Sequence, residues 1–239
     1  MSTAILDGPV ESVRGIHLPP DDLAFVIPRS VRSLQGFRDW YASDDFPEEG
    51  HISYLAGEIF IDMGHERISS HVDLKGEIFH RLKSLVEELG TGQLFTDGTR
   101  VVNDTADLSS EPDCCFFTWE SVRSGRVVLQ RDPGGKDATE VHGSPDMVLE
   151  VVSRSSVSKD TVVLPDLYHK AEIPEFWLID ARKDTVVFQI FRMGESAYEL
   201  SPSKDGWHES RVFGSSFRME RFVNPIGLWQ HRLLIQKPS

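Results

Sequence analysis

Two carboxylates interrupt an otherwise apolar segment of the sequence, SPDMVLEVV at residues 144–152. The aliphatic and β-branched residues of this segment predict a buried strand, in which Asp146 and Glu150 share one face. Burying a carboxylate is costly, or forces the group to take up a proton, unless a cation or hydrogen-bond donors compensate. The segment therefore indicates a site at which acidic side chains meet a positively charged partner.

A second acidic strand is predicted at EPDCCFF, residues 111–117, where Asp113 follows a proline and precedes an apolar run. If the two strands are neighbours, Asp113 and Glu150 could bind one divalent ion. Backbone carbonyls and water would complete the oxygen shell that Mg²⁺ prefers. Asp146 lies about 13 Å along the strand from Glu150, too far for both to bind one ion. We assign Asp146 to the edge of the site or to the start of the strand.

The overall charge excludes a broad basic surface for nucleic acid. The 239 residues include 25 basic and 38 acidic side chains, for a formal charge of −13 and a pI near 5.1. Proteins that bind nucleic acid through such a surface depend on cations that release counterions from the phosphates. Any polyanion must therefore be met locally, with metal ions as one source of positive charge.

The composition favours a cytoplasmic protein. No apolar stretch approaches the roughly 20 residues that span a bilayer, and the N-terminal segment lacks the pattern of a signal peptide. Cys114 and Cys115 are adjacent, so on a strand they would point to opposite faces and not pair. Such cysteine usage is typical of a reducing compartment.

The longest helix is predicted over residues 70–90. Ser70 and Asp73 have the spacing of a capping box, and Gly90 ends the pattern. The apolar residues at helical spacing are Leu74, Ile78, Leu82, Leu85 and Leu89.

Further elements surround this helix. A short helix is expected within residues 33–43, a hairpin within 51–63, and a helix that begins near Pro165. Strands are expected at LAFVI, GTRVVN, RVVLQ, PEFWLID, DTVVFQIFR and ESRVF, in addition to the acidic segments. This order predicts an α/β fold with one mixed sheet. Residues 1–33 would form an N-terminal arm, and residues 34–239 a single domain.

The motifs together resemble the PD-(D/E)XK, or restriction-endonuclease-like, nuclease superfamily, and more narrowly a large bacterial family of endonucleases. The resemblance runs from about residue 33 to residue 192 and rests on the order of its motifs. These are AGEIFIDM, a helix opened near His71, EPDCCFF, SPDMVLEVVSRSS and KDTVVLPDLYHKAEIPEFWLID. It implies a mixed β-sheet flanked by helices, and we expect a β-rich C-terminal extension beyond it.

This chain departs from the superfamily pattern at the lysine. The superfamily lysine should stand at Val152, and the position used in the narrower family is Leu164, four residues after Asp160. Lys159 and Lys170 are the nearest replacements, and we favour Lys159 because it lies closer to the strand end. The upstream hairpin also has Ser53 where an acidic residue is typical, although Glu58 is retained.

The resemblance implies a Mg²⁺- or Mn²⁺-dependent endonuclease that acts on DNA. Asp113 and Glu150 would be the metal ligands, Glu58 would assist through water or a second ion, and Lys159 would act on the attacking water. Asp146 would complete the site at its edge. A non-catalytic module that binds nucleic acid or a protein partner is the alternative, and a homodimer is left open.

Overall fold

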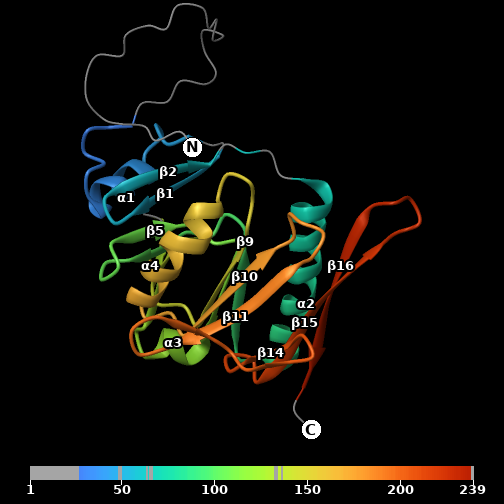
Figure 1. The fold of residues 1–239 in the computed structure, drawn as a ribbon. Coiled ribbons are helices and arrows are strands. Elements are labelled where there is room, and N and C mark those ends of the chain that lie inside the picture. Colours follow the sequence, from blue (N-terminus) through green and yellow to red (C-terminus); the bar gives the residue numbers. More distant parts are fainter. Residues whose placement is uncertain are drawn as a thin grey trace, which may run out of the picture.

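The computed structural model describes residues 27–47, 50–62, 64, 67–131, 134–135 and 137–237, which form an α/β fold (Figure 1). The strand predicted at LAFVI lies almost entirely outside these residues, as does most of the expected arm. The described chain contains two six-stranded sheets and a four-stranded C-terminal sheet. The expectation of one mixed sheet is therefore wrong, because two mixed sheets are present. Each six-stranded sheet contains both parallel and antiparallel neighbours.

The central sheet carries the two acidic segments on neighbouring strands. Within it, β9 pairs in parallel with β10 and antiparallel with β6, and the β6 register places Cys114 opposite Leu149. Its strands, in spatial order, are β12 (Tyr198–Leu200), β11 (Val187–Met193), β10 (Glu175–Asp180), β9 (Met147–Val151), β6 (Cys114–Thr118) and β3 (Gly92–Thr96).

The second sheet contains the predicted hairpin. Ala56 and Gly57 form its turn with φ of 49° and 91°, the left-handed values that a tight hairpin requires. The strands, in spatial order, are β2 (Glu58–Asp62), β1 (His51–Leu55), β5 (Leu108–Ser110), β4 (Val101–Asn103), β8 (Ala138–Gly143) and β7 (Val127–Arg131). Strands β5 and β8 were not predicted from the sequence.

Three of the helical regions match the predicted positions, whereas α3 (Trp119–Arg123) was not predicted. The helical elements are α1 (Leu34–Tyr41), η1 (Ile68–Asp73), α2 (Leu74–Leu89), α3, η2 (Lys159–Val163) and α4 (Leu164–Lys170), where η1 and η2 are π-helical turns. The capping box is wrong, because η1 starts before Ser70 and Asp73 makes no capping hydrogen bond. Gly90 ends α2 with φ of 63°, and Pro165 lies in the first turn of α4, as predicted. None of the described helices is both long and apolar enough to cross a membrane.

The two faces of β9 pack against different helices. Met147, Leu149 and Val151 are buried in one apolar cluster with the predicted stripe of α2 except Leu89, which is exposed. Val148 and Val152 belong to a second cluster with α4. Cys114 and Cys115 also divide between these clusters and are free thiols, as their adjacent positions predict. Glu150 therefore lies on the α4 side, among residues that exclude water from it.

The C-terminal sheet packs against α2 and forms the β-rich extension. It contains β13 (Ser203–Lys204), β14 (Trp207–Ser210), β15 (Ser215–Val223) and β16 (Trp229–Gln236). Phe217 and Leu233 are buried in the α2 cluster, and the Phe217 ring lies 4.7 Å from that of Trp177. The ESRVF strand is predicted correctly only to Ser210, since residues 211–214 form a turn.

One carboxylate joins this extension to the central sheet. Glu175 at the start of β10 is buried, and its Oε1 accepts hydrogen bonds from Trp177 Nε1 and Ser210 Oγ, both at 2.6 Å. Its Oε2 accepts hydrogen bonds from the backbone amides of Arg211 and Val212, at 2.9 and 3.4 Å. The donors come from both sheets, so this carboxylate fixes the position of the β14–β15 turn.

Removing this acceptor should weaken the whole fold. We expect Glu175→Ala to lower the free energy of unfolding by about 3 kcal/mol, because buried donors lose their partner. Urea denaturation would measure the change, with the exposed neighbour Glu209→Ala as the control. A loss no larger than that of the control would show that the carboxylate does not hold the two sheets together.

Candidate active site

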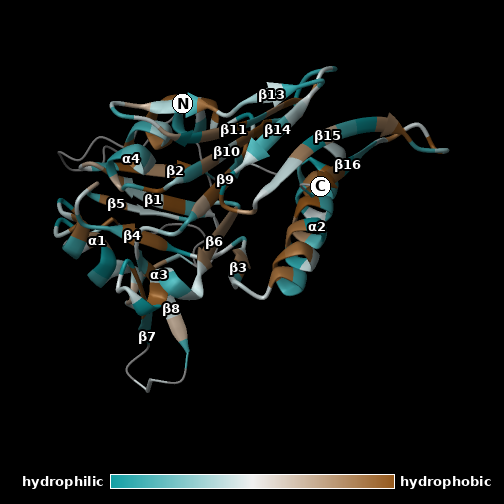
Figure 2. Cartoon of the chain, turned by 90° about the horizontal axis from the view of Figure 1, so that it is seen from below, coloured by the Kyte–Doolittle hydropathy of each residue, from teal (hydrophilic) through white to brown (hydrophobic). Residues whose placement is uncertain are grey.

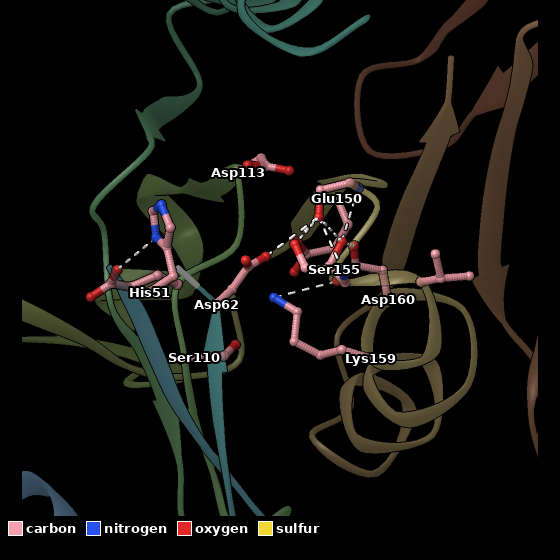
Figure 3. A network of polar contacts seen from close by, with 12 residues as sticks. His51, Asp62, Ser110, Asp113, Glu150, Ser155, Lys159 and Asp160 are labelled. Atoms are coloured by element: carbon pink, nitrogen blue, oxygen red, sulfur yellow. Dashed lines mark hydrogen bonds and ion pairs between the residues drawn. The ribbon is translucent and has the colours of Figure 1, made fainter. Parts of the chain in front are cut away.

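A cavity of about 410 Å³ opens where β9 ends and the two π-helical turns begin. Its walls come from segments far apart in the sequence, namely β1, β2, α2, the start of β6, β9 and η2. Figure 3 shows the acidic and basic side chains that face one another there. The ionisable residues at its centre are Asp62, Lys75, Asp113, Glu150, Lys159 and Asp160.

Asp113 is held at the start of β6, beside β9. Its Oδ2 accepts a hydrogen bond from the backbone amide of Val151 at 2.6 Å, which ties it to the residue after Glu150. Its Oδ1 lies 2.8 Å from the ammonium of Lys75, which also donates to Asp97 Oδ2 at 2.9 Å. The two segments that the sequence predicts to be neighbours are therefore adjacent, and both acidic residues line the cavity.

Glu150 is almost completely buried and has a specific donor. The Tyr168 hydroxyl donates to Glu150 Oε1 at 2.5 Å and lies 3.2 Å from Ser110 Oγ. Burial raises the pKa of Glu150 well above its usual range, and the charges of Asp160 and Asp113 act in the same direction. The charge of Lys159 and the bond from Tyr168 oppose that shift. Ionised Glu150 therefore depends on the cations beside it.

Lys159 brings a cation to these carboxylates. Its side chain is only 14% exposed, and its ammonium lies 3.4 Å from Asp160 Oδ1 (Figure 3). Burial alone would lower the pKa of Lys159, but the charges of Glu150, Asp160 and Asp113 raise it above its usual value. Burial raises the pKa of Asp160, whose Oδ2 accepts a hydrogen bond from Ser156 Oγ. Lys159 is therefore an ammonium at neutral pH.

The direction of Lys159 follows from the π-helical turn. The backbone amide of Leu164 donates to the carbonyl of Lys159, five residues earlier, which is the bond that defines a π-helix. Residues five apart are then aligned along the helix. Lys159 consequently projects from the same side as Leu164, one turn closer to the N-terminus.

Asp62 occupies the place expected for Glu58. Glu58 starts β2, is exposed, and is not among the residues that line the cavity, whereas Asp62 at the far end of β2 is. Asp62 accepts hydrogen bonds from the Gly64 amide at 2.8 Å and from Ser153 Oγ at 3.4 Å. Burial works to raise the pKa of Asp62, but hydrogen bonds from Ser155 and Gly64 lower it below the usual value. Its even spacing from Glu58 along the strand could have revealed it.

Asp146 lies at the opposite end of β9 from the cavity. It accepts hydrogen bonds from the Thr118 amide at 2.7 Å and Ser121 Oγ at 2.6 Å, and pairs with Arg126. These contacts join the start of β9 to the first turn of α3. Of its two expected positions, the structure places Asp146 at the start of the strand.

Lys75 was missed by the sequence reasoning. It precedes Ile78 by three residues and Leu82 by seven, so it occupies an apolar position of α2, and it is buried. A lysine on a buried helical face needs an acidic partner. That placement was the signal that could have identified it.

A further chain of ionisable groups borders the cavity. His51 Nδ1 lies 3.5 Å from Glu111 Oε2, and Glu111 Oε1 lies 2.5 Å from the buried guanidinium of Arg100. The hydrogen bond to Glu111 raises the pKa of His51. Burial works to raise the pKa of Glu111, but His51 and Arg100 lower it. On the other wall, His71 Nε2 lies 3.0 Å from the carbonyl of Val151.

The donor set can be tested for its fit to a divalent ion. No group of three described His, Cys, Asp or Glu side chains is close enough to hold an ion by itself. Asp113 and Glu150 nevertheless offer hard oxygen ligands, and Glu150 Oε2 accepts no hydrogen bond from a described residue. Mg²⁺ usually keeps several waters and takes one or two carboxylates. The residues therefore fit an ion held by Asp113, Glu150 and water.

Removing the Lys159 ammonium should destabilise the fold. We expect Lys159→Met to lower the free energy of unfolding by about 2 kcal/mol, because Glu150 and Asp160 would remain buried without their cation. Urea denaturation at neutral pH in EDTA would measure this. The exposed Lys170→Met is the matched control and should change stability by less than about 0.5 kcal/mol. Equal stability of both variants would mean that Lys159 does not compensate the buried carboxylates.

A search of curated proteins gives no match, whereas a comparison with solved structures supports this fold. Among solved structures, a crystal structure from Anabaena variabilis, described as a "putative nuclease belonging to DUF820", is similar with a TM-score of 0.50 and 21% identity. The similarity covers 76% of this chain and 90% of that chain, and it establishes a shared fold.

The family match covers residues 34–220, from α1 to within β15. The matched family model is Uma2, described as "Putative restriction endonuclease". This range contains every residue that lines the cavity. The chain therefore belongs to the Uma2 family and has a restriction-endonuclease-like fold.

Proposed function

We propose that this protein is a metal-dependent endonuclease that hydrolyses phosphodiester bonds in DNA. The observation that carries the proposal is the convergence of Asp113, Glu150 and the Lys159 ammonium on one cavity. A buried carboxylate of raised pKa such as Glu150 is costly to the fold, and such groups cluster at functional sites. Family membership supports a nuclease, while the metal and the DNA substrate are our inference from the residue types.

Asp113 and Glu150 would hold Mg²⁺ or Mn²⁺. When bound, the ion would lower the pKa of a ligated water and offset charge on the scissile phosphate. Val151 and Lys75 fix the two oxygens of Asp113, and Tyr168 fixes one oxygen of Glu150. These positioning residues leave Glu150 Oε2 as the oxygen available for the ion.

Lys159 would orient the attacking water and stabilise negative charge on the phosphate. Its raised pKa keeps it protonated, so it acts as a hydrogen-bond donor and a positive charge, not as a base. The family position for the lysine is occupied by Leu164, which is buried in the α4 cluster. Because Lys159 lies one π-turn earlier on the same side of the helix, it would take over the function of that lysine.

Asp62 replaces Glu58 as the proposed third carboxylate. It reaches the cavity from β2, and its lowered pKa keeps it ionised. Asp62 lies on a different wall of the cavity from Asp113 and Glu150, so it would act through water. Asp146 has only partners that stabilise the structure, so the proposed chemistry does not include it.

Site variants should separate catalysis from metal binding. With supercoiled plasmid, Mg²⁺ or Mn²⁺ and low salt, we expect Asp113→Asn, Glu150→Gln and Lys159→Met each to reduce nicking at least about 100-fold. Calorimetric titration with Mn²⁺ should show that Lys159→Met still binds metal and Glu150→Gln does not. Glu58→Gln, which is exposed and outside the cavity, is the control and should retain activity.

Three outcomes would contradict parts of the proposal. Wild-type protein that fails to nick DNA with either ion would favour a non-catalytic module with a nuclease fold. Full activity of Lys159→Met would remove the relocated lysine from the mechanism. Unchanged Mn²⁺ binding by Asp113→Asn and Glu150→Gln would place the metal elsewhere.

A further inference from the structure

The β15–β16 hairpin projects from the body as an arm, which we define as residues 215–236 (Figure 1). Its inner half is anchored, because Phe217 and Leu233 are buried against α2 and the Leu233 amide donates to Glu77 Oε1 at 3.0 Å. Its outer half continues past the end of the family match at residue 220. This part of the chain is therefore separate from the range that matches the family model and forms the cavity.

The outer half of the arm exposes apolar side chains. Ile226 is 78% exposed and Val223 54%, and Phe222, Leu228 and Trp229 are also exposed. Figure 2 shows hydrophobic residues at the far end of β15. The turn is ordered by Asn224 Oδ1, which accepts hydrogen bonds from the amides of Ile226 and Leu228. The arm thus presents a shaped apolar tip to its surroundings.

The arm is also the basic part of an acidic protein. Residues 215–236 contain three of the 25 basic residues and one of the 38 acidic residues, and residues 221–232 contain no acidic residue. Arg232 stacks over Phe222 at 5.3 Å, and Arg221 over Trp229 at 5.1 Å. The single acidic residue, Glu220, pairs with Arg218 at 2.5 Å. Arg232 lies opposite Glu220 in the strand register but forms no ion pair with a carboxylate of the described residues.

The root of the arm is attached to the walls of the cavity. Arg221 donates to the carbonyls of Ala181 at 2.5 Å and Asp184 at 3.1 Å, on either side of Arg182, which lines the cavity. On the other strand, His231 Nδ1 lies 3.5 Å from Asp73 Oδ2 in η1, the turn that carries His71. Both strands of the arm thus leave the body at the rim of the candidate active site.

We propose that the arm grips duplex DNA beside the phosphodiester in the cavity, with its apolar tip in the minor groove and Arg232 at the phosphates. Proteins that bind this groove read it with basic residues and frequently insert apolar wedges between base steps. β-ribbon proteins are known to use their strands in the minor groove as well as in the major groove. The inference rests on the proposed function for the site, but it concerns binding alone. The net positive charge of the arm and its attachment at the rim of the cavity favour the phosphate backbone of DNA as its partner.

Binding can be measured without cleavage. Fluorescence anisotropy with a labelled 30-base-pair duplex, in EDTA and low salt, would report the affinity of each variant. We expect Ile226→Asp to weaken binding at least about tenfold. Arg232→Glu should also weaken it and reduce the slope of log K against log salt by about one. Val128→Asp is the matched control, because it adds the same charge at an exposed position on β7 and should bind within about twofold of wild type.

The outcomes distinguish the arm from the active site. Wild-type affinity of Ile226→Asp and Arg232→Glu would overturn the arm proposal, whatever the nicking assay shows. Conversion of a dimer to a monomer by Ile226→Asp, with unchanged DNA affinity, would also overturn it and identify a second copy of the chain as the partner. Loss of nicking in Glu150→Gln with unchanged duplex binding, together with weakened binding by Ile226→Asp, would support the two proposals separately. Tight arm-dependent binding by an inactive wild type would remove only the catalytic function.

Discussion

The structure around the cavity depends on one constraint, the burial of Glu150 among other acidic groups. A carboxylate inside an apolar sheet is tolerated only with donors and cations at hand. Tyr168 supplies the donor, Lys159 supplies a nearby positive charge, and Lys75 neutralises the adjacent Asp113. These partners come from α4, η2 and α2, so helices on both faces of the sheet contribute side chains that interact with Glu150 or Asp113.

The two π-helical turns explain how polar side chains reach that point. Both turns precede a regular helix, η1 before α2 and η2 before α4, and both contribute to the cavity wall. Such turns are rare and are often found at functional sites. In η2 the wider turn aligns Lys159 with Leu164, and Lys159 lines the same cavity as Asp113 and Glu150.

Two further carboxylates, at the starts of β9 and β10, have a structural function. Asp146 joins the start of β9 to α3, and Glu175 joins β10 to the C-terminal sheet. Each accepts several hydrogen bonds, which offsets the cost of removing it from water. A motif residue in this fold is therefore assigned to chemistry or to structure by its partners, not by its presence in the motif.

The sequence alone determined the features that depend on local periodicity. Alternation in residues 144–152 places Glu150 on one face of the strand and Leu149 and Val151 on the other. The apolar stripe predicts α2, and the turn at Gly57 predicts the hairpin. The order of the motifs identified the fold. The closeness of Lys159 to the end of the predicted strand made it the favoured replacement for the superfamily lysine. Only the tertiary structure decided that Asp62, and not Glu58, reaches the cavity, and that Lys75 meets Asp113. The physical reason is that periodicity fixes the face of an element, whereas which end of that face meets another segment depends on register and packing between distant residues.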